Sequence, residues 1–398
     1  MKRNNVLIYL GTAFLAYGQS FSRGNFPSYV ETLGGTIVNY GFIQSVQTFS
    51  NLLSLLPAAF LADRLGHRRL VLSGTLVYTF SFLIIAFTPH WEYLLIGAFG
   101  IGLAGGMIMP SQVAILAHSN PAERIYVFTR NETARWSCLA LGYFSSSVFF
   151  IIFKNEFSYR NLQSTMIITL IIITFAIIPS LLLVNTEEWR NNAGEKQKIN
   201  LKRILRSSEG AFIVGFLFIN LVIGFGAGFL VPFTQPYFVR RFSLGPSEIN
   251  LIMGIAQIIT ALFMGFIPLL ANKLSDTKVI YLTQGLSIPL TIILAYSRIL
   301  PLSLFAFLFR IALMNMSNPA QTTILQKYIP ETYRATIQSL REANDRIGRG
   351  FSPSISAVLI EGSNDFYISF TMTAIMYSVA VSILFLITRN LKRKKHLK

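Results

Sequence analysis

Two segments of the chain place carboxylate and guanidinium groups at helical spacing in otherwise apolar surroundings. The first holds Glu132 and Arg135, three residues apart. The second holds four ionisable residues that share one helical face: Glu342, Asp345, Arg346 and Arg349. Acids in such places can carry a proton and arginines can bind an anion, but the two kinds can also neutralise each other as salt bridges. Glu132, Glu342 and Asp345 are therefore candidates for proton coupling, with structural pairing as the alternative.

Arg310 differs from these residues because it stands in the middle of an apolar segment with no acid nearby in its own helix. It is either an anion-binding or gating residue, or half of a buried pair with an acid elsewhere. With other polar residues it defines a candidate substrate pathway: Arg310, Asn318, Gln321, Glu132, Arg135, Arg346, Arg349, Asn220 and Gln235. Six arginines but only three acids fall within such apolar segments, and this excess favours an anionic substrate or a lipid phosphate.

The elements that carry these residues are membrane-spanning helices. Of the 398 residues, 53% are hydrophobic and 13% are charged, whereas soluble domains carry roughly a quarter charged residues. Uncharged runs such as 70–91 and 211–239 exceed the roughly 20 residues that a helix needs to cross a bilayer. The alternating pattern of a membrane barrel is absent. The sequence therefore predicts an all-α integral membrane protein.

Twelve spans are expected, in two groups of six. They cover residues 6–29, 36–61, 70–89, 92–117, 125–153, 163–185, 211–238, 247–271, 279–297, 300–326, 335–360 and 366–388. We accordingly divide the chain into an N-terminal six-helix bundle (1–185), a cytoplasmic linker (186–208), a C-terminal six-helix bundle (209–388) and a basic cytoplasmic tail (389–398).

The two bundles are related by an internal repeat. At an offset of 209 residues, LADRLGHRR at 61–69 falls on LANKLSDTK at 270–278, and Pro110 falls on Pro319. Further along, the offset becomes 210, and Glu132 falls on Glu342. Repeated halves are a sequence mark of many transporters.

The net charge of +17 has a topological explanation. With the N-terminus inside, 22 lysines and arginines fall in inner segments and six in outer segments, in keeping with the positive-inside rule. Nucleic acid is therefore not an expected partner. We expect a monomer in the plasma membrane with both termini cytoplasmic, and a tail that either binds anionic lipid headgroups or is simply solvated.

Several other classes of chemistry find no support in the sequence. One cysteine and four scattered histidines provide no disulfide and no metal-ligand spacing. No phosphate-binding Gly-x-x-x-x-Gly-Lys-Ser/Thr motif is present, so ATP is not expected to be the direct energy source. No nucleophile, base and orienting group occur together in a recognisable arrangement. We expect neither an enzyme nor a cofactor.

The stretch LADRLGHRR, between the second and third spans, resembles the signature of the major facilitator superfamily. That signature reads G-x-L-A-D-R-x-G-R-R-R or similar, and Ala59 and His67 are the departures from it. The fourth span, GAFGIGLAGGMIMP, resembles the glycine-rich fourth helix of the family, although Ile96 stands where an arginine often occurs. The drug antiporters' glycine-proline motif is missing, since Tyr143 follows Gly142.

This resemblance implies a conformational latch on the cytoplasmic side, with Asp63 interacting with the start of the eleventh helix and nearby arginines. The latch residues are Asp63, Arg64, Gly66, Arg68 and Arg124. Gly66 would permit the sharp turn of a tight loop, and the basic residues would hold that loop inside. The alternative is a loop that only sets topology.

The predicted function is secondary transport of a small solute by alternating access, with proton coupling left open. An aromatic stripe in the seventh span suits export of drugs or amphiphilic metabolites, unless it only packs helices: Phe225, Phe229, Phe233 and Tyr237. The excess arginines suit uptake or exchange of an organic anion. A receptor or scaffold that keeps the fold without transport is the alternative of another class.

Overall fold

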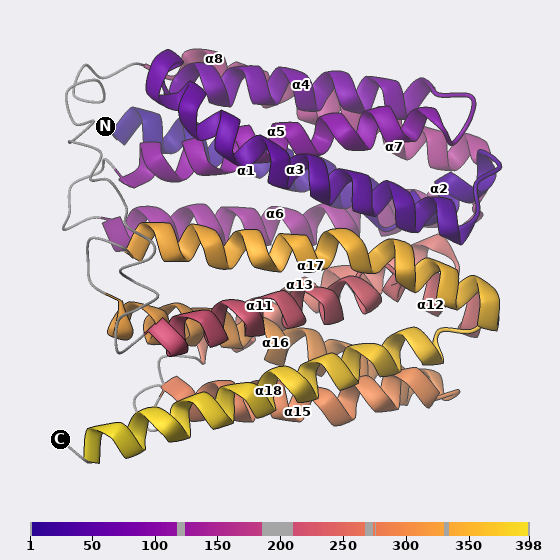
Figure 1. The fold of residues 1–398 in the computed structure, drawn as a ribbon. Helices are drawn as coiled ribbons and strands as arrows, with labels where there is room; N and C mark the ends of the chain where they lie inside the picture. Colours follow the sequence, from indigo (N-terminus) through magenta and orange to yellow (C-terminus); the bar gives the residue numbers. More distant parts are fainter. Residues whose placement is uncertain are drawn as a thin grey trace. The chain divides into compact units, whose positions relative to one another are not determined.

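The computed structural model describes residues 2–117, 124–184, 210–266, 274, 276–329 and 334–396, and its regular elements within these ranges are α-helices (Figure 1). The predicted linker at 186–208 lies outside the described residues. The basic tail is described only in its backbone, which continues the last helix to His396.

The first half of the chain forms eight helical elements at the six predicted spans. They are α1 (Lys2–Arg23), α2 (Phe26–Thr32), α3 (Ile37–Leu65), α4 (His67–Phe87), α5 (Tyr93–Ala117), α6 (Arg124–Ile152), α7 (Tyr159–Phe175) and α8 (Ile177–Leu182). The break between α7 and α8 has a local cause. The ring of Pro179 clashes with the carbonyl group four residues earlier, and that residue, Phe175, is where α7 ends.

The second half repeats this plan. Its described helices are α11 (Gly210–Leu230), α12 (Thr234–Phe242), α13 (Pro246–Gly265), α15 (Asp276–Tyr296), α16 (Leu300–Tyr328), α17 (Arg334–Ser363) and α18 (Tyr367–His396). Within the described residues, nine helical segments are long and apolar enough to cross a membrane. The long helices α1, α3 and α17 also lie at predicted spans, and α1 and α17 are the more polar of them.

Several helix pairs recur in the two halves, as the internal repeat predicts. In the first half, α1 packs against α6 and α7, and α4 packs against α5 and α7. In the second half, α11 packs against α17 and α18, and α15 packs against α16 and α18. Each of these four pairs in the first half thus has a counterpart about 209 residues away in the second.

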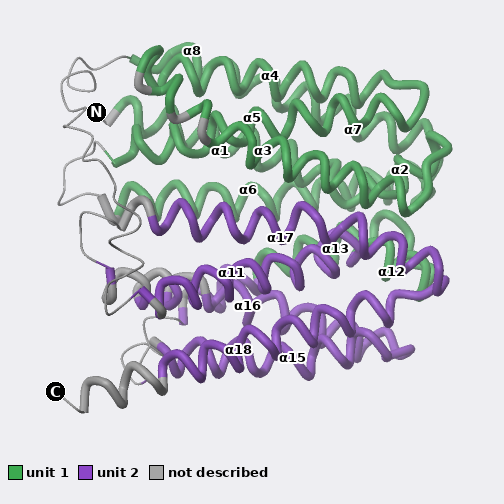
Figure 2. Tube along the Cα trace, viewed as in Figure 1, with its two compact units in different colours: residues 1–196, 235–258 green, residues 197–234, 259–398 purple. Residues whose placement is uncertain are grey.

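The compact units of the structure differ from this division by one segment (Figure 2). One unit comprises residues 1–196 and 235–258, and the other comprises residues 197–234 and 259–398. The segment 235–258 includes α12 except its first residue, and the first part of α13. It belongs to the second half in sequence, yet it packs with the helices of the first.

Close packing in the first unit depends on the glycines of α5. The Cβ of any larger residue at Gly102 would collide with the Ser50 hydroxyl group and the Gln47 carbonyl oxygen of α3. At the same contact, the Asn51 side chain donates a hydrogen bond to the Gly102 carbonyl oxygen at 3.1 Å. Small residues let membrane helices approach each other in this way. The close contact between the backbones of α3 and α5 fixes the orientation of the polar face of α3.

Gly66 forms the tight turn that the sequence predicts. Helix α3 ends at Leu65 and α4 begins at His67, so Gly66 alone reverses the chain, with φ +85° and ψ 149°. This backbone region is essentially restricted to glycine.

We therefore expect Gly66→Ala to destabilise the folded protein by about 1–3 kcal/mol, the cost of holding another residue in that conformation. An added Cβ meets no atom within 4 Å, so backbone strain is the whole effect. Thermal unfolding in detergent measures it. Gly362→Ala is the control, because that helical glycine also has open space around its Cβ position but no positive φ. Equal melting temperatures for the two variants would contradict the strain.

Candidate functional site

The charged face of α17 lies against α11 in the second unit. The Arg349 Nε donates to the Asp345 Oδ2 at 2.7 Å, an ion pair within one helix turn. One turn earlier, the Arg341 Nε donates to the Asn220 Oδ1 of α11 at 3.1 Å. Asn220 is buried and also donates to the Phe216 carbonyl oxygen. The two helices therefore share a polar network that holds one predicted pathway residue from each, Asn220 and Arg349.

Glycines bring these two helices close enough for the network to form. A Cβ at Gly224 of α11 would collide with the backbone of Asp345. A Cβ at Gly348 of α17 would lie 2.5 Å from both the Leu221 carbonyl oxygen and the Phe225 nitrogen. Backbone lies against backbone on both sides, which positions Asp345 at the crossing point of the helices.

Arg310, in the middle of α16, is the most deeply buried charged group of the candidate site. Its side chain is 2% exposed, and its Nη2 donates to the Tyr377 hydroxyl group of α18 at 2.9 Å. The guanidinium carbon also lies 5.6 Å from the centre of the Tyr377 ring. The Nε is buried and has no hydrogen-bond partner among the described residues. The ion pairs of the described part of the chain do not include Arg310.

Tyr377 of α18 joins Arg310 of α16 to α11. Its hydroxyl group accepts from Arg310. Its ring packs against Gly226 of α11, where a Cβ would lie 2.8 Å from the ring. Sequence reasoning missed both Tyr377 and Arg341. The spacing of Arg341 from Asp345 was a usable signal, but nothing in the sequence pairs Tyr377 with Arg310.

The other predicted pathway residues of the second half are only partly described. Gln321 is buried, and its Nε2 donates to the Ser317 hydroxyl group at 2.9 Å. Arg346 is half-buried on α17. The side chain of Asn318 lies outside the described residues. Glu342, the remaining acid of α17, accepts a hydrogen bond from Gln338 at 3.2 Å.

Three predicted pathway residues lie in the first unit: Glu132, Arg135 and Gln235. Glu132 and Arg135 form an ion pair on α6 at 2.5 Å, with side chains 49% and 33% exposed. Exposed pairs of this kind contribute only about 0–1 kcal/mol to stability, so the pair is not an important structural support. Gln235 is buried in α12, within the segment that packs with the first half. Their place on a substrate pathway stays a prediction.

The latch residues are described only in part. The Arg64 guanidinium carbon lies 4.4 Å from the centre of the Phe60 ring, and the Arg68 Nη2 donates to the Leu181 carbonyl oxygen at 3.0 Å, at the end of α8. The side chains of Asp63 and Arg124 lie outside the described residues. The turn at Gly66 is therefore confirmed, while the latch itself stays a prediction.

Comparison with known proteins identifies the family. The family model described as Major Facilitator Superfamily matches residues 8–353 and 216–398. The chain belongs to the major facilitator superfamily. It is therefore a multi-pass membrane protein and a secondary transporter rather than an enzyme.

Relatives and solved structures agree with this membership of the major facilitator superfamily. A curated relative, "Multidrug resistance protein 2" of Bacillus subtilis (strain 168), is 21% identical over 371 residues, which cover 89% of this chain and 88% of the relative. A D-xylose-proton symporter has a TM-score of 0.78 at 15% identity, with 96% of each chain covered. A bacterial homologue of the lysosomal transporter Spinster has a TM-score of 0.75 at 13% identity, with 98% of each covered. At these identities the structures are similar in fold.

A groove between α15 and α18 of this superfamily member does not contain the candidate site. It has a volume of about 380 Å³ and is lined by apolar and hydroxyl side chains, among them Ile292, Thr371 and Ser378. No charged residue lines it. The buried and charged groups of the candidate site lie instead at Arg310, Tyr377 and the charged face of α17.

Proposed function

We propose that this superfamily member transports a small organic anion by alternating access, with Arg310 holding the anionic group. The observation that carries the proposal is the burial of Arg310 without an acid partner among the described residues. An arginine side chain stays charged in a protein, and a charge buried in a membrane protein needs compensation. A substrate carboxylate or phosphate group supplies that compensation.

Within the described part of the chain, the contacts of Arg310 leave some of its N–H groups free to donate to such a ligand. Tyr377 accepts one of the five guanidinium N–H groups, but a neutral hydroxyl group does not cancel the positive charge. The planar guanidinium group forms paired hydrogen bonds with carboxylate and phosphate oxygens, and its buried Nε is available for one of them. Tyr377 fixes the orientation of the group. Asp345 is not the missing partner, because Arg349 already holds it.

The amphiphile alternative has less support. Three of the four residues of the aromatic stripe, Phe229, Phe233 and Tyr237, are 6%, 0% and 0% exposed, so they pack against protein. Phe225 is half-buried. The name of the Bacillus relative nevertheless favours export as the direction. Export of an anionic metabolite is therefore the form of the function that we propose.

Proton coupling belongs to the same proposal. Glu132 and Asp345 are each held by an arginine on their own helix, and protonation of either acid would break that ion pair. Glu342 accepts its hydrogen bond from the neutral Gln338. Protonation of Glu342 breaks no ion pair that the structure describes, so we favour it as the coupling acid.

A thermal-shift panel on the purified protein in detergent tests the substrate class. Organic anions, phosphate esters, lipophilic cations and neutral sugars are compared at two pH values, with chloride salts matching the ionic strength. A ligand at 100 times its dissociation constant stabilises the native state by about 2.7 kcal/mol. We expect melting temperatures to rise with anions alone. Stabilisation by cations or sugars alone would contradict the proposal and assign Arg310 a structural role.

A further inference from the structure

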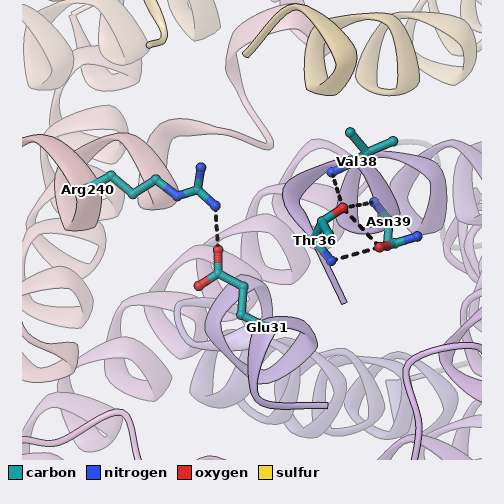
Figure 3. Close-up of polar contacts among 5 residues, drawn as sticks. All are labelled: Glu31, Thr36, Val38, Asn39 and Arg240. Carbon is teal, nitrogen blue, oxygen red and sulfur yellow. Dashed lines mark hydrogen bonds and ion pairs between the residues drawn. The ribbon is translucent and has the colours of Figure 1, made fainter. Parts of the chain in front are cut away.

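The equivalent helices α3 and α13 begin in different ways. In α3, the Thr36 hydroxyl group accepts from the Val38 and Asn39 nitrogens at 3.2 and 3.4 Å. In return, the Asn39 Oδ1 accepts from the Thr36 nitrogen at 2.7 Å (Figure 3). This reciprocal arrangement is a capping box, which satisfies the free N–H groups at the start of a helix with local side chains.

Helix α13 cannot be capped locally in this way. At the offset of 209 residues, Gly245 replaces Thr36, so the side chain that would cap the helix is absent. The equivalents of Val38 and Asn39 are Ser247 and Glu248. Both of these are bound instead by Asn155, from the turn between α6 and α7.

Asn155 reproduces the capping box from the first half of the chain. Its Oδ1 accepts from the Ser247 nitrogen at 2.8 Å. Its Nδ2 donates to the Glu248 carboxylate oxygens at 3.1 and 3.0 Å. A Cβ at Gly245 would lie 2.7 Å from this Nδ2, so the amide group occupies the space that a capping side chain would need.

The turn that presents Asn155 is unusual. Lys154 and Asn155 have φ values of 68° and 51°, in the left-handed region that asparagine tolerates better than most residues. In the corresponding turn of the second half, Asn364 has φ 50°, but the neighbouring Asp365 accepts from the nitrogen of the next residue, Phe366. Of these two turns, the one at Asn155 makes the contact with another helix that the structure describes.

Further polar contacts join the same segment, 235–258, to the first half. The hydroxyl groups of Ser147 and Ser247 lie 2.9 Å apart. The Asn250 Nδ2 donates to the Asn25 Oδ1 at 2.9 Å. Figure 3 shows the third contact, the ion pair of Glu31 and Arg240 at 2.8 Å. We call these three contacts and the Asn155 cap the clasp.

We propose that Asn155 is a detachable helix cap that closes the clasp in one state of the transport cycle and leaves α13 when the clasp opens. Alternating access requires the two halves of a transporter to separate at one end at a time. The Asn155 cap differs from the other contacts of the clasp because it satisfies a backbone N–H group at the start of α13. The inference rests on membership of the superfamily and is independent of the anion proposal.

A disulfide between Ser147→Cys and Ser247→Cys, in a Cys138→Ser background, reports whether the clasp is closed. The two hydroxyl groups are close enough for cysteines to bond there without large movement. The rate of disulfide formation with a mild oxidant is followed by mass spectrometry of the remaining thiols. Thr75→Cys with Ser180→Cys is the control pair, since those hydroxyl groups lie 3.3 Å apart between α4 and α8.

Asn155→Ala is expected to slow disulfide formation in the clasp about five-fold, as the loss of a helix cap of ordinary strength implies. Asn364→Ala is the matched control, because it also removes an asparagine in a left-handed turn but breaks no side-chain hydrogen bond that the structure describes. The Thr75 and Ser180 pair should react at the same rate in every background. Equal clasp rates in the Asn155→Ala and Asn364→Ala proteins would overturn the proposal.

A second variant distinguishes an open clasp from a loss of stability at the start of α13. Gly245→Ser supplies a local cap and displaces the Asn155 amide group, so we expect slow disulfide formation together with normal amide exchange at the start of α13. Asn155→Ala should slow the disulfide and also speed that exchange. Unchanged disulfide formation in Gly245→Ser would show that the cap does not hold the clasp.

Discussion

Replacing Arg310 by glutamine is expected to abolish the stabilisation of the purified protein by organic anions and to lower anion affinity about 100-fold or more. Two hydrogen bonds from a charged group to a ligand contribute about 1.5–3 kcal/mol each, and glutamine keeps neither the charge nor the fork of donors. Isothermal titration with an anion found in the thermal-shift panel measures the loss. Arg298→Gln is the matched control, because Arg298 is exposed and the change in net charge is the same.

The stability of the ligand-free variant distinguishes a binding residue from a structural one. Removing one member of a buried ion pair costs about 3–5 kcal/mol. If the charge of Arg310 is uncompensated until a ligand binds, the ligand-free Arg310→Gln protein should be at least as stable as the unmodified protein. Tyr377→Phe, which removes only the hydroxyl acceptor, should weaken anion binding to a lesser degree. Unchanged anion affinity in Arg310→Gln, or a large loss of ligand-free stability, would contradict the assignment.

The second large effect is expected at the crossing of α11 and α17. Gly348→Ala places a Cβ 2.5 Å from two backbone atoms, which cannot move aside as a flexible side chain can. The helices must separate, and overpacking of this kind costs about 1–3 kcal/mol or more. We expect a clear fall in melting temperature and, because Asp345 and Asn220 lie at this crossing, weaker anion binding as well.

Gly285→Ala is the control for that substitution. Gly285 lies in α15 with no atom within 4 Å of a Cβ position, so alanine there should be neutral or stabilising by up to about 1 kcal/mol through helix propensity. Thermal unfolding of the two variants in the same detergent compares them directly. A Gly348→Ala protein as stable as Gly285→Ala would mean that the helices do not approach as closely as the structure shows.

The sequence predicts contacts within one helix better than contacts between helices. The contact between Glu132 and Arg135 and the contact between Asp345 and Arg349 each join residues three or four apart on one helix, and such neighbours meet whatever the rest of the fold does. The turn at Gly66 is equally local, because a single residue links two helices. Spacing along the chain is sufficient to predict features of this kind.

Contacts between different helices depend on how each helix is rotated and where it crosses its neighbours. Tyr377 meets Arg310 from 67 residues away, and Asn220 meets Arg341 from 121 residues away. The rotation of each helix about its axis is set by the packing of small residues such as Gly224 and Gly348. The sequence of either helix alone does not show which residues these glycines contact.

The cap on α13 shows the same division between local and distant information. The absence of a capping side chain at Gly245 is visible in the sequence once the repeat is aligned. The replacement by Asn155 is not visible in the sequence, because it depends on a turn 92 residues before Ser247 that folds back onto the start of the helix. Composition, run length and repeat thus specify the class of protein, the spans and the local turns. The partners of Arg310, Asn220 and Ser247 follow from the packing of helices that are distant in sequence, where side-chain spacing carries no information.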